Sequence, residues 1–218
     1  MFPVKICGIA NRESLELVLK YPVSAIGFIF YPNSPRFIKP TDALEMIKLI
    51  PINVSTVGVF VNELTEKINK IAEQLNLDFI QLHGNESPEY CSSLSYPIIK
   101  ALRVGQKFSF ETLKNYNVHS FLLDTYQPGL FGGTGDTFNW ELLQNLELNI
   151  PIILSGGLNP DNVQDGIQKT NPVAIDVNSG VESCPGQKDE GKLKKLYENL
   201  KNLKSEQNIF RMTEKSEL

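Results

Sequence analysis

Short apolar runs recur along the chain at nearly even intervals. Eight of them have the β-branched and aromatic composition typical of strands, and they lie at 3–9, 25–31, 55–61, 79–84, 97–104, 120–126, 151–157 and 174–180. Each run is almost continuously apolar instead of alternating with polar residues, which is typical of parallel strands that are covered on both faces. The pattern therefore predicts eight parallel strands.

Amphipathic segments separate these runs, and the first four begin with residues that favour helix starts. The start signals are Asn11 before 12–20, Asp42 with Glu45 three residues on, Asn62 before 64–76, and Ser87 followed by Pro88. Weaker segments lie where crossovers between parallel strands are required, at 109–117, 139–147, 160–169 and 188–202. A strand followed by a helix, repeated eight times, is therefore expected.

This alternation predicts an α/β fold, a single-domain (β/α)8 TIM barrel. An open doubly wound sheet alternates in the same way, but no glycine-rich dinucleotide fingerprint follows the first strand. A chain of 218 residues, 41% of them hydrophobic, fits one core. We expect the barrel over 1–203, followed by a polar tail over 204–218 that frays or forms a short surface helix.

Composition excludes several classes of partner. The net charge is −4 with basic residues scattered among acids, so nucleic acid is not an expected partner. The three cysteines have no CxxC spacing, which argues against a disulfide framework or a zinc site and favours a reducing compartment. Since no apolar run approaches the roughly 18 residues that span a bilayer, we expect a cytoplasmic protein without a membrane partner.

Active sites of such barrels lie at the carboxyl ends of the strands and in the loops that follow them. Many polar residues fall at these positions: Lys5, Cys7, Arg36, Gln81, His83, Arg103, Asp124, Ser155, Asp176 and Ser179. The sequence therefore predicts an active site at this rim.

Cys7 and Asp124 have the chemistry of a base and an acid. A thiol at the end of the first strand is suited to act as a base, and Lys5 on the same strand face would favour the thiolate if it points inward; the other interpretation is a small buried hydrophobe. Asp124 follows three apolar residues, so partial desolvation would raise its pKa into the range of an acid. A helix cap or an ion pair explains Asp124 equally well, and Asp176 has the same ambiguity.

Other rim residues suggest an anionic substrate. Two segments, 155–157 and 178–180, place Gly156, Gly157, Ser179 and Gly180 after strands seven and eight, where phosphate is often held; each segment alone would be a turn. Arg36 suits a carboxylate or is a solvated surface arginine.

Two more features bear on the site. His83 contacts substrate or is a satisfied core histidine, and because no ligand pattern surrounds it we expect no metal. The glycine-rich loop 127–138 is suited to form a lid.

Several motifs, in this order, resemble phosphoribosylanthranilate isomerases over residues 3 to about 200. They are Lys5-Ile6-Cys7-Gly8, Gly27-Phe28-Ile29-Phe30, Ser34-Pro35-Arg36, Val57-Gly58-Val59-Phe60, Gln81-Leu82-His83-Gly84, Leu123-Asp124, Gly132-Gly133-Thr134-Gly135, Ser155-Gly156-Gly157-Leu158 and Asp176-Val177-Asn178-Ser179-Gly180-Val181-Glu182. Two departures are Asn139, where the family often has aspartate, and a tail that runs past the usual end.

The resemblance implies an Amadori rearrangement in tryptophan biosynthesis without a cofactor. It implies that Cys7 is the general base, that Asp124 is the general acid and that Arg36 holds the anthranilate carboxylate. The glycine segments of strands seven and eight would hold the phosphate, and His83 and Asp176 are further candidates for substrate binding. We expect a monomer or homodimer that acts on a small phosphorylated substrate.

Two alternative functions fit the sequence less well. A pentose-phosphate epimerase would require paired histidines and carboxylates at several strand ends, and the chain has only His83 and His119. A barrel kept as a binding or scaffold protein without catalysis is disfavoured because Cys7 and Asp124 are both present.

Overall fold

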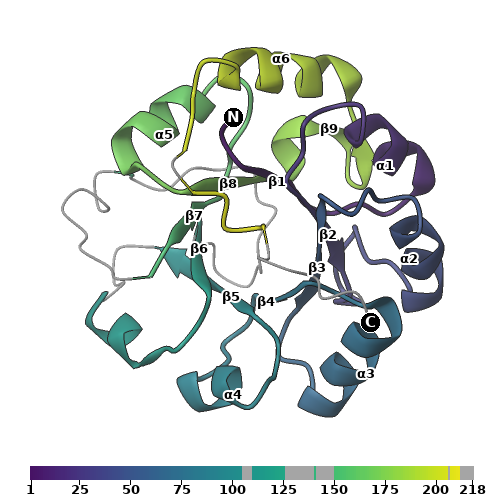
Figure 1. The fold of residues 1–218 in the computed structure, drawn as a ribbon, viewed down its shortest axis with the longest axis vertical. Coiled ribbons are helices and arrows are strands. Elements are labelled where there is room, and N and C mark those ends of the chain that lie inside the picture. Colours follow the sequence, from purple (N-terminus) through teal and green to yellow (C-terminus); the bar gives the residue numbers. More distant parts are fainter. Residues whose placement is uncertain (105–109, 126–139, 141–149, 206, 212–218) are drawn as a thin grey trace.

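Eight parallel strands close into a barrel in the computed structural model, which describes residues 1–104, 110–125, 140, 150–205 and 207–211 (Figure 1). The strands are β1 (Val4–Ile6), β2 (Ala25–Ile29), β3 (Ser55–Phe60), β4 (Phe79–Leu82), β5 (Ile98–Val104), β6 (Ser120–Thr125), β7 (Ile152–Leu154) and β8 (Ala174–Val177). Closure occurs where Lys5 of β1 pairs with Asp176 of β8. The predicted barrel and strand order are confirmed, although most strands end earlier than their apolar runs.

Helices form the outer layer around the barrel (Figure 1). They are α1 (Arg12–Val18), α2 (Pro40–Ile47), α3 (Thr65–Leu75), α4 (Pro88–Ser92), the 3-10 helix η1 (Phe110–Asn115), α5 (Val163–Thr170) and α6 (Glu190–Leu200). No helix in the described ranges is both long and apolar enough to cross a membrane. The predicted loop 127–138 and, apart from Trp140, the predicted helix 139–147 lie outside the described residues.

The predicted helix starts are partly confirmed. The side chains of Asn11 and Ser87 accept hydrogen bonds from the first turns of α1 and α4, as capping residues do. The other two were wrong: α2 begins at Pro40, which places Asp42 inside its first turn. Asn62 lies in a turn with a φ of 48°, and α3 begins only at Thr65.

An additional short hairpin follows β8 and was not predicted. A 3-10 turn, η3 (Ser179–Val181), leads into β9 (Glu182–Cys184), which pairs antiparallel with β10 (Gln187–Lys188). Asn11 of the β1–α1 loop donates its side-chain N–H to the carbonyl of Gly186 at the hairpin tip. The hairpin is thereby fixed beside the first loop of the barrel.

The barrel interior changes in character along the strands. Its lower layer is apolar and consists of Ala25, Val57, Phe79, Ile99, Ala101, Leu122, Ile153 and Ala174. Two residues further along four of these strands, on the same face, stand Gln81, Asp124, Ser155 and Asp176. The interior is therefore divided into an apolar floor at the amino ends of the strands and a polar rim at their carboxyl ends.

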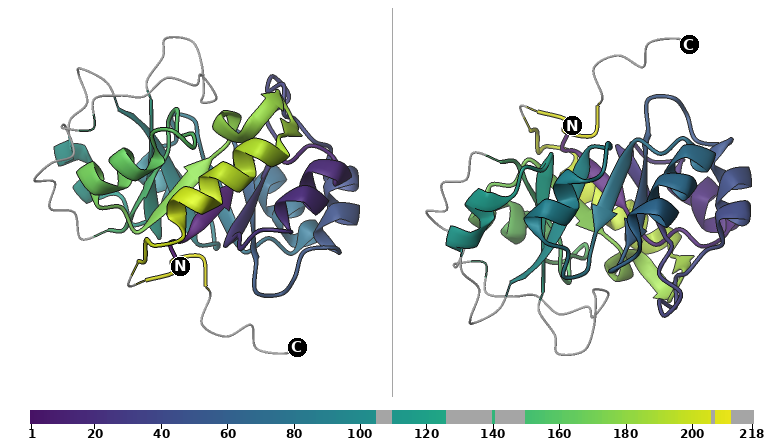
Figure 2. Two further views of the ribbon diagram at one scale, coloured as in Figure 1. Left: turned by 90° about the horizontal axis from the view of Figure 1, so that it is seen from above. Right: turned by 90° about the horizontal axis from the view of Figure 1, so that it is seen from below.

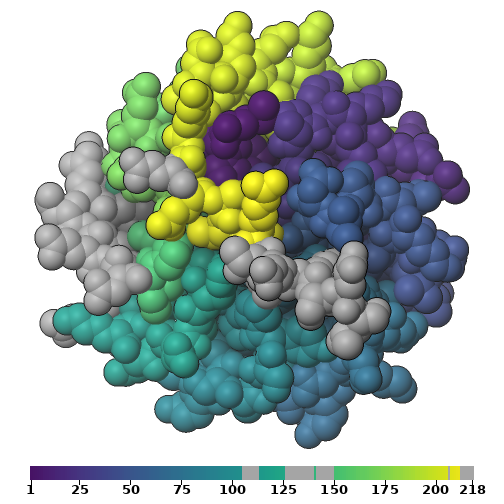
Figure 3. Space-filling view, in the orientation of Figure 1, coloured from purple at the N-terminus to yellow at the C-terminus, as the bar shows by residue number. Residues whose placement is uncertain are grey.

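The C-terminal segment closes the floor. Ile209 and Phe210 are buried, and Phe210 meets the ring of Phe79 edge-on with centroids 6.1 Å apart. The carbonyl of Ile209 lies 2.9 Å from Nε2 of His119, and Ser55 donates its hydroxyl to the carbonyl of Phe210. Figures 2 and 3 show this segment at the same end as the N-terminus and across the centre of the ring.

For residues 207–211, this placement corrects the expectation that the tail frays or forms a surface helix. Ile209 and Phe210 are buried because the closed barrel presents an apolar surface at its floor, and that surface is invisible in the local composition of a polar segment.

Candidate active site

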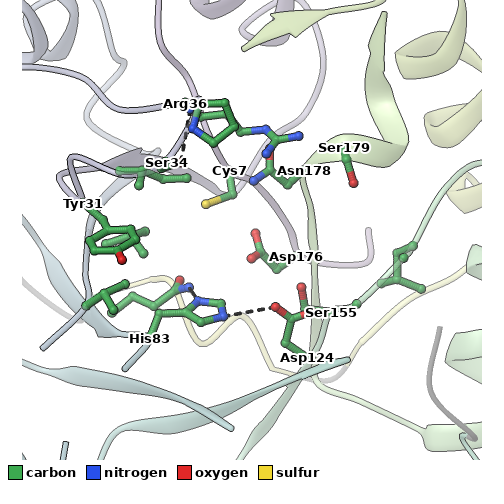
Figure 4. A pocket seen from close by; sticks show the side chains of 18 of the residues that line it. Cys7, Tyr31, Ser34, Arg36, His83, Asp124, Ser155, Asp176, Asn178 and Ser179 are labelled. Atoms are coloured by element: carbon green, nitrogen blue, oxygen red, sulfur yellow. Dashed lines mark hydrogen bonds and ion pairs between the residues drawn. The ribbon is translucent and has the colours of Figure 1, made fainter. Parts of the chain in front are cut away.

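A cavity of about 330 Å³ opens at the polar rim. Side chains from the ends of β1, β2, β4, β6, β7 and β8 line it, and Figure 4 shows Cys7, Asp124 and Asp176 around one space. Every residue predicted to catalyse the reaction or bind substrate lines this cavity except Gly180, whereas Lys5 and Arg103, which were predicted only to lie at the rim, do not line it. The carboxyl ends of the strands meet here because the sheet is closed and parallel.

Cys7 stands beside a buried ion pair. Lys5 is fully buried, and its Nζ lies 2.9 Å from Oδ1 of Asp176. A Cβ on Gly27 would come within 2.7 Å of the Cys7 sulfur and 3.1 Å of the Lys5 Nζ, so this glycine leaves the space in which the two side chains meet. Lys5 therefore points inward, toward the thiol.

Burial raises the pKa of the Cys7 thiol above its ordinary value, and the negative charge of Asp176 acts in the same direction. The ammonium groups of Lys5 and Lys188 oppose this and lower the pKa of Cys7. The pKa of Lys5 is raised because Asp176 and Cys7 together outweigh the effect of desolvation. The cation of Lys5 is thus retained in the barrel interior, where it favours a thiolate at Cys7.

Asp124 is held by hydrogen bonds at both of its oxygens. Its Oδ1 accepts the backbone N–H of Thr125 at 2.8 Å, and its Oδ2 lies 3.1 Å from Nε2 of His83. Nδ1 of His83 lies in turn 3.0 Å from the side-chain amide nitrogen of Gln81. His83 therefore contacts Asp124, a partner that the sequence did not reveal.

Arg36 forms an ion pair with Glu182 inside the protein. Its Nε and Nη2 donate to the two carboxylate oxygens of Glu182, with Nη2 to Oε2 at 2.7 Å. Lys188 donates to the same carboxylate at 2.9 Å, and burial lowers the pKa of Lys188. Because Glu182 occupies the Nε–Nη2 edge of the guanidinium, a substrate carboxylate would meet the edge formed by Nη1 and Nη2.

The glycines of the last two loops differ in what they do. Gly156 and Gly157 line the cavity with φ of 81° and 64°, a conformation that favours glycine. A Cβ on Gly156 would lie 2.7 Å from the backbone nitrogen of Thr125. A Cβ on Gly180 would overlap the carbonyl oxygen of Leu158, so this glycine permits contact between the two loops.

Four contributors were given no role in the sequence analysis: Gln81, Asn178, Glu182 and Lys188. Gln81 and Asn178 line the cavity, whereas Glu182 and Lys188 lie behind Arg36. Gln81 stands two residues before His83 on the same strand face, and that spacing was a usable signal. Nothing local in the sequence signals the pairing of Arg36 with Glu182, because 146 positions separate them.

The fold and the site together define a (β/α)8-barrel enzyme with a thiol, carboxyl groups, an arginine and two glycines of positive φ at its carboxyl rim. Among the residues that the structure describes, no group of three or more His, Cys, Asp or Glu side chains is placed to hold a metal ion.

Comparisons with known proteins identify the family within this class. Residues 4–199 match the family model of N-(5'-phosphoribosyl)anthranilate (PRA) isomerase. The isomerase of Trichlorobacter lovleyi is 42% identical over 202 residues, which are 92% of this chain and 98% of the relative. The chain belongs to the N-(5'-phosphoribosyl)anthranilate isomerase family and is an isomerase.

Solved structures agree with this assignment. The crystal structure of phosphoribosyl anthranilate isomerase from Thermotoga maritima is 41% identical, with a TM-score of 0.85 over 93% of this chain and all of the other. A second structure, 39% identical with a TM-score of 0.81 over the same shares, holds reduced 1-(o-carboxyphenylamino)-1-deoxyribulose 5-phosphate.

Proposed function

We propose that this enzyme converts N-(5-phosphoribosyl)anthranilate to 1-(2-carboxyphenylamino)-1-deoxyribulose 5-phosphate, with Asp124 as general acid and Cys7 as general base. One observation carries the assignment of roles: the thiol and the carboxyl group face one cavity from different strands, β1 and β6 (Figure 4). The rearrangement needs one proton delivered and another removed within the same bound molecule.

The first step opens the ribose ring. Asp124 delivers its proton to the ring oxygen as the bond from this oxygen to C1 breaks, and the anthranilate nitrogen supplies the electrons for an iminium. Asp124 becomes a carboxylate, which the backbone N–H of Thr125 stabilises, and Nε2 of His83 lies 3.1 Å from its other oxygen. The Thr125 donor therefore favours the acid's conjugate base at the moment it forms.

The second step removes the proton from C2. The Cys7 thiolate accepts it, and the electron pair moves toward the iminium to give an enolamine. The enolamine becomes the ketone when C1 gains a proton and the hydroxyl on C2 loses its proton. The substrate's own nitrogen is the electron sink in this scheme. Lys5 contributes by favouring the charged form of Cys7, as its effect on the pKa indicates.

The two anions of the substrate would be held at different parts of the rim. Arg36 would bind the anthranilate carboxylate, with its guanidinium oriented by Glu182. The backbone N–H groups around Gly156, Gly157, Ser179 and Gly180 would hold the phosphate. His83 and Asp176 also line the cavity and would contact the sugar. A cytoplasmic location and a monomeric or homodimeric state remain predictions of this proposal.

Turnover is tested with substrate formed in place from anthranilate and phosphoribosyl pyrophosphate, followed by the loss of anthranilate-type fluorescence. We expect turnover that depends on added enzyme and is unchanged by metal chelators. Pentose-phosphate epimerisation, assayed in parallel, should be absent. A preparation that binds the product but does not turn over substrate would instead indicate a barrel retained for binding.

A further inference from the structure

A row of three buried side chains crosses the rim from β4 to β6. Gln81 Nε2 lies 3.0 Å from His83 Nδ1, and His83 Nε2 lies 3.1 Å from Asp124 Oδ2. All three line the cavity, and Figure 4 shows the His83–Asp124 contact. His83 and Gln81 are thus connected to the residue that the proposed function makes the acid.

The chemistry of these groups determines where the histidine carries its proton. An amide nitrogen of glutamine donates and does not accept, so Nδ1 of His83 must present its lone pair to Gln81. A neutral imidazole whose Nδ1 accepts has its proton on Nε2. That proton points at Asp124 Oδ2, and His83 is therefore a donor toward the carboxyl group.

This arrangement has a consequence for the proton of the acid. The proton of the Asp124 carboxyl group cannot lie on Oδ2 between this oxygen and Nε2 of His83, because the N–H of His83 already occupies that space. His83 also has no lone pair left with which to take the proton, since Gln81 occupies Nδ1. The proton of Asp124 can then be transferred only to an acceptor other than His83, such as a substrate bound in the cavity.

We propose that Gln81 is a positioning residue, whose side-chain amide keeps His83 protonated at Nε2 so that His83 donates to Asp124 and cannot accept its proton. This inference rests on the proposed function of Asp124 as the acid.

The orientation of the Gln81 amide decides which nitrogen of His83 carries the proton. Gln81 Oε1 is buried, with no hydrogen-bond partner in the described part of the chain. A reversed amide would give Oε1 a partner in His83, but only with a proton on Nδ1. In the neutral ring Nε2 would then be an acceptor, and the proton of Asp124 would be shared with His83 instead of being reserved for the substrate.

Two substitutions at Gln81 distinguish a His83 proton on Nε2 from one on Nδ1. Gln81→Glu offers only acceptors to Nδ1 and should move the His83 proton to Nδ1. Gln81→Met is similar in length, offers no donor and should leave the ring a mixture of both forms. We expect kcat to fall roughly tenfold or more in Gln81→Glu and severalfold in Gln81→Met, with KM changed less than about twofold, because the acid and not substrate binding is affected.

The proton position is measured directly by nitrogen NMR on protein labelled at histidine. The chain has two histidines, so a His119→Gln variant assigns the signals of His83. We expect a protonated Nε2 and an unprotonated Nδ1 in the unaltered protein, and the reverse in Gln81→Glu. Gln164→Glu, on the exposed face of α5, makes the same change of charge as a control and should change neither kcat nor the His83 signals.

Several results would overturn the inference. A His83 proton on Nδ1 in the unaltered protein would do so, as would unaltered kcat in Gln81→Met, because added charge would then explain any loss in Gln81→Glu. Failure of the proposed function looks different: Asp124→Asn would retain kcat. If Asp124→Asn is inactive and either of the first two results is obtained, Asp124 is still the general acid and only the proposed role of Gln81 is refuted.

Discussion

The rim and the floor of the barrel are built from the same strands and are opposite in chemistry. At the rim, buried ionic side chains pair across long sequence distances, as Lys5 does with Asp176 and Arg36 with Glu182. At the floor the same strands contribute alanine, valine, leucine, isoleucine and phenylalanine, and the C-terminal segment covers them. Two residues along a strand suffice to pass from one environment to the other.

The difference shows where stability and chemistry are located. Burial of apolar surface at the floor contributes free energy of folding without placing a charge in the interior. The rim carries desolvated charges that favour the fold only while each has its partner. A substitution at the rim that leaves these pairs intact should change activity first, whereas a substitution at the floor should change the free energy of unfolding and leave activity intact.

The largest effect is expected from removing the two proton-transfer groups. Cys7→Ala and Asp124→Asn should each lower kcat by at least about a hundredfold, because each removes a group that moves a proton in the reaction. Steady-state kinetics measure this, and unfolding in urea should show nearly unaltered stability. Cys7→Ser should be nearly as slow as Cys7→Ala, since a hydroxyl is far less acidic than a thiol. Near-normal kcat in either variant would remove that residue from the mechanism.

A second test at the rim concerns the carboxylate. Arg36→Ala should lower kcat/KM by a factor equivalent to a loss of roughly 2–4 kcal/mol in transition-state stabilisation, because the carboxylate of the substrate is left unpaired. Inhibition by inorganic phosphate should change little. Arg12→Ala, which removes an exposed arginine paired only with Glu16, is the matched control and should leave kcat/KM unaltered.

The opposite pattern is expected at the phosphate end. Gly157→Ala should weaken inhibition by inorganic phosphate together with substrate binding. Gly157 suits this test better than Gly180, whose substitution would displace the backbone of Leu158 and alter the packing of the loop. If Arg36→Ala lost phosphate inhibition while Gly157→Ala kept it, the proposed orientation of the substrate would be reversed.

At the floor, Phe210→Ala should lower the free energy of unfolding by about 3–5 kcal/mol while kcat and KM remain unaltered. Phe210 is 2% exposed and packs on Phe79, so its removal leaves the floor open to water. Urea denaturation measures the change, and truncation after Leu203 should have at least the same effect. A loss of activity without a loss of stability would show that the floor and the rim are coupled.

The smallest expected effect is a shift in the pKa of Cys7, and two variants should shift this pKa in opposite directions. Lys5→Met removes a cation that lowers this pKa, so the thiolate should become rarer and alkylation at neutral pH slower. Asp176→Asn removes an anion that raises it, so alkylation should become faster. The measurement uses a background in which Cys91 and the exposed Cys184 are serine.

The opposite changes in alkylation rate distinguish an electrostatic effect on Cys7 from damage to the structure. A purely structural role for the Lys5–Asp176 pair predicts the same direction of change in both variants. In the unaltered enzyme kcat/KM should rise with pH through the raised pKa of Cys7, since the thiolate is the active form.

The sequence by itself determined the elements and the rim. Eight apolar runs alternating with amphipathic segments predicted parallel strands, because each run needs cover on both faces, and the absence of a dinucleotide fingerprint favoured a barrel over an open sheet. The position of Cys7, Asp124 and Asp176 at strand ends or in the loops that follow then placed them at the same rim. Such local signals depend only on neighbouring residues, which is why they could be interpreted without a structure.

Only the tertiary structure decided which side chains are partners. The contact of His83 with Asp124 joins residues 41 positions apart, and that of Lys5 with Asp176 joins residues 171 apart. Neither pair exists until the strands close into a ring in one register. The burial of Ile209 and Phe210 has the same cause: two apolar residues in a polar tail become part of the core only when a closed barrel presents an apolar floor to receive them.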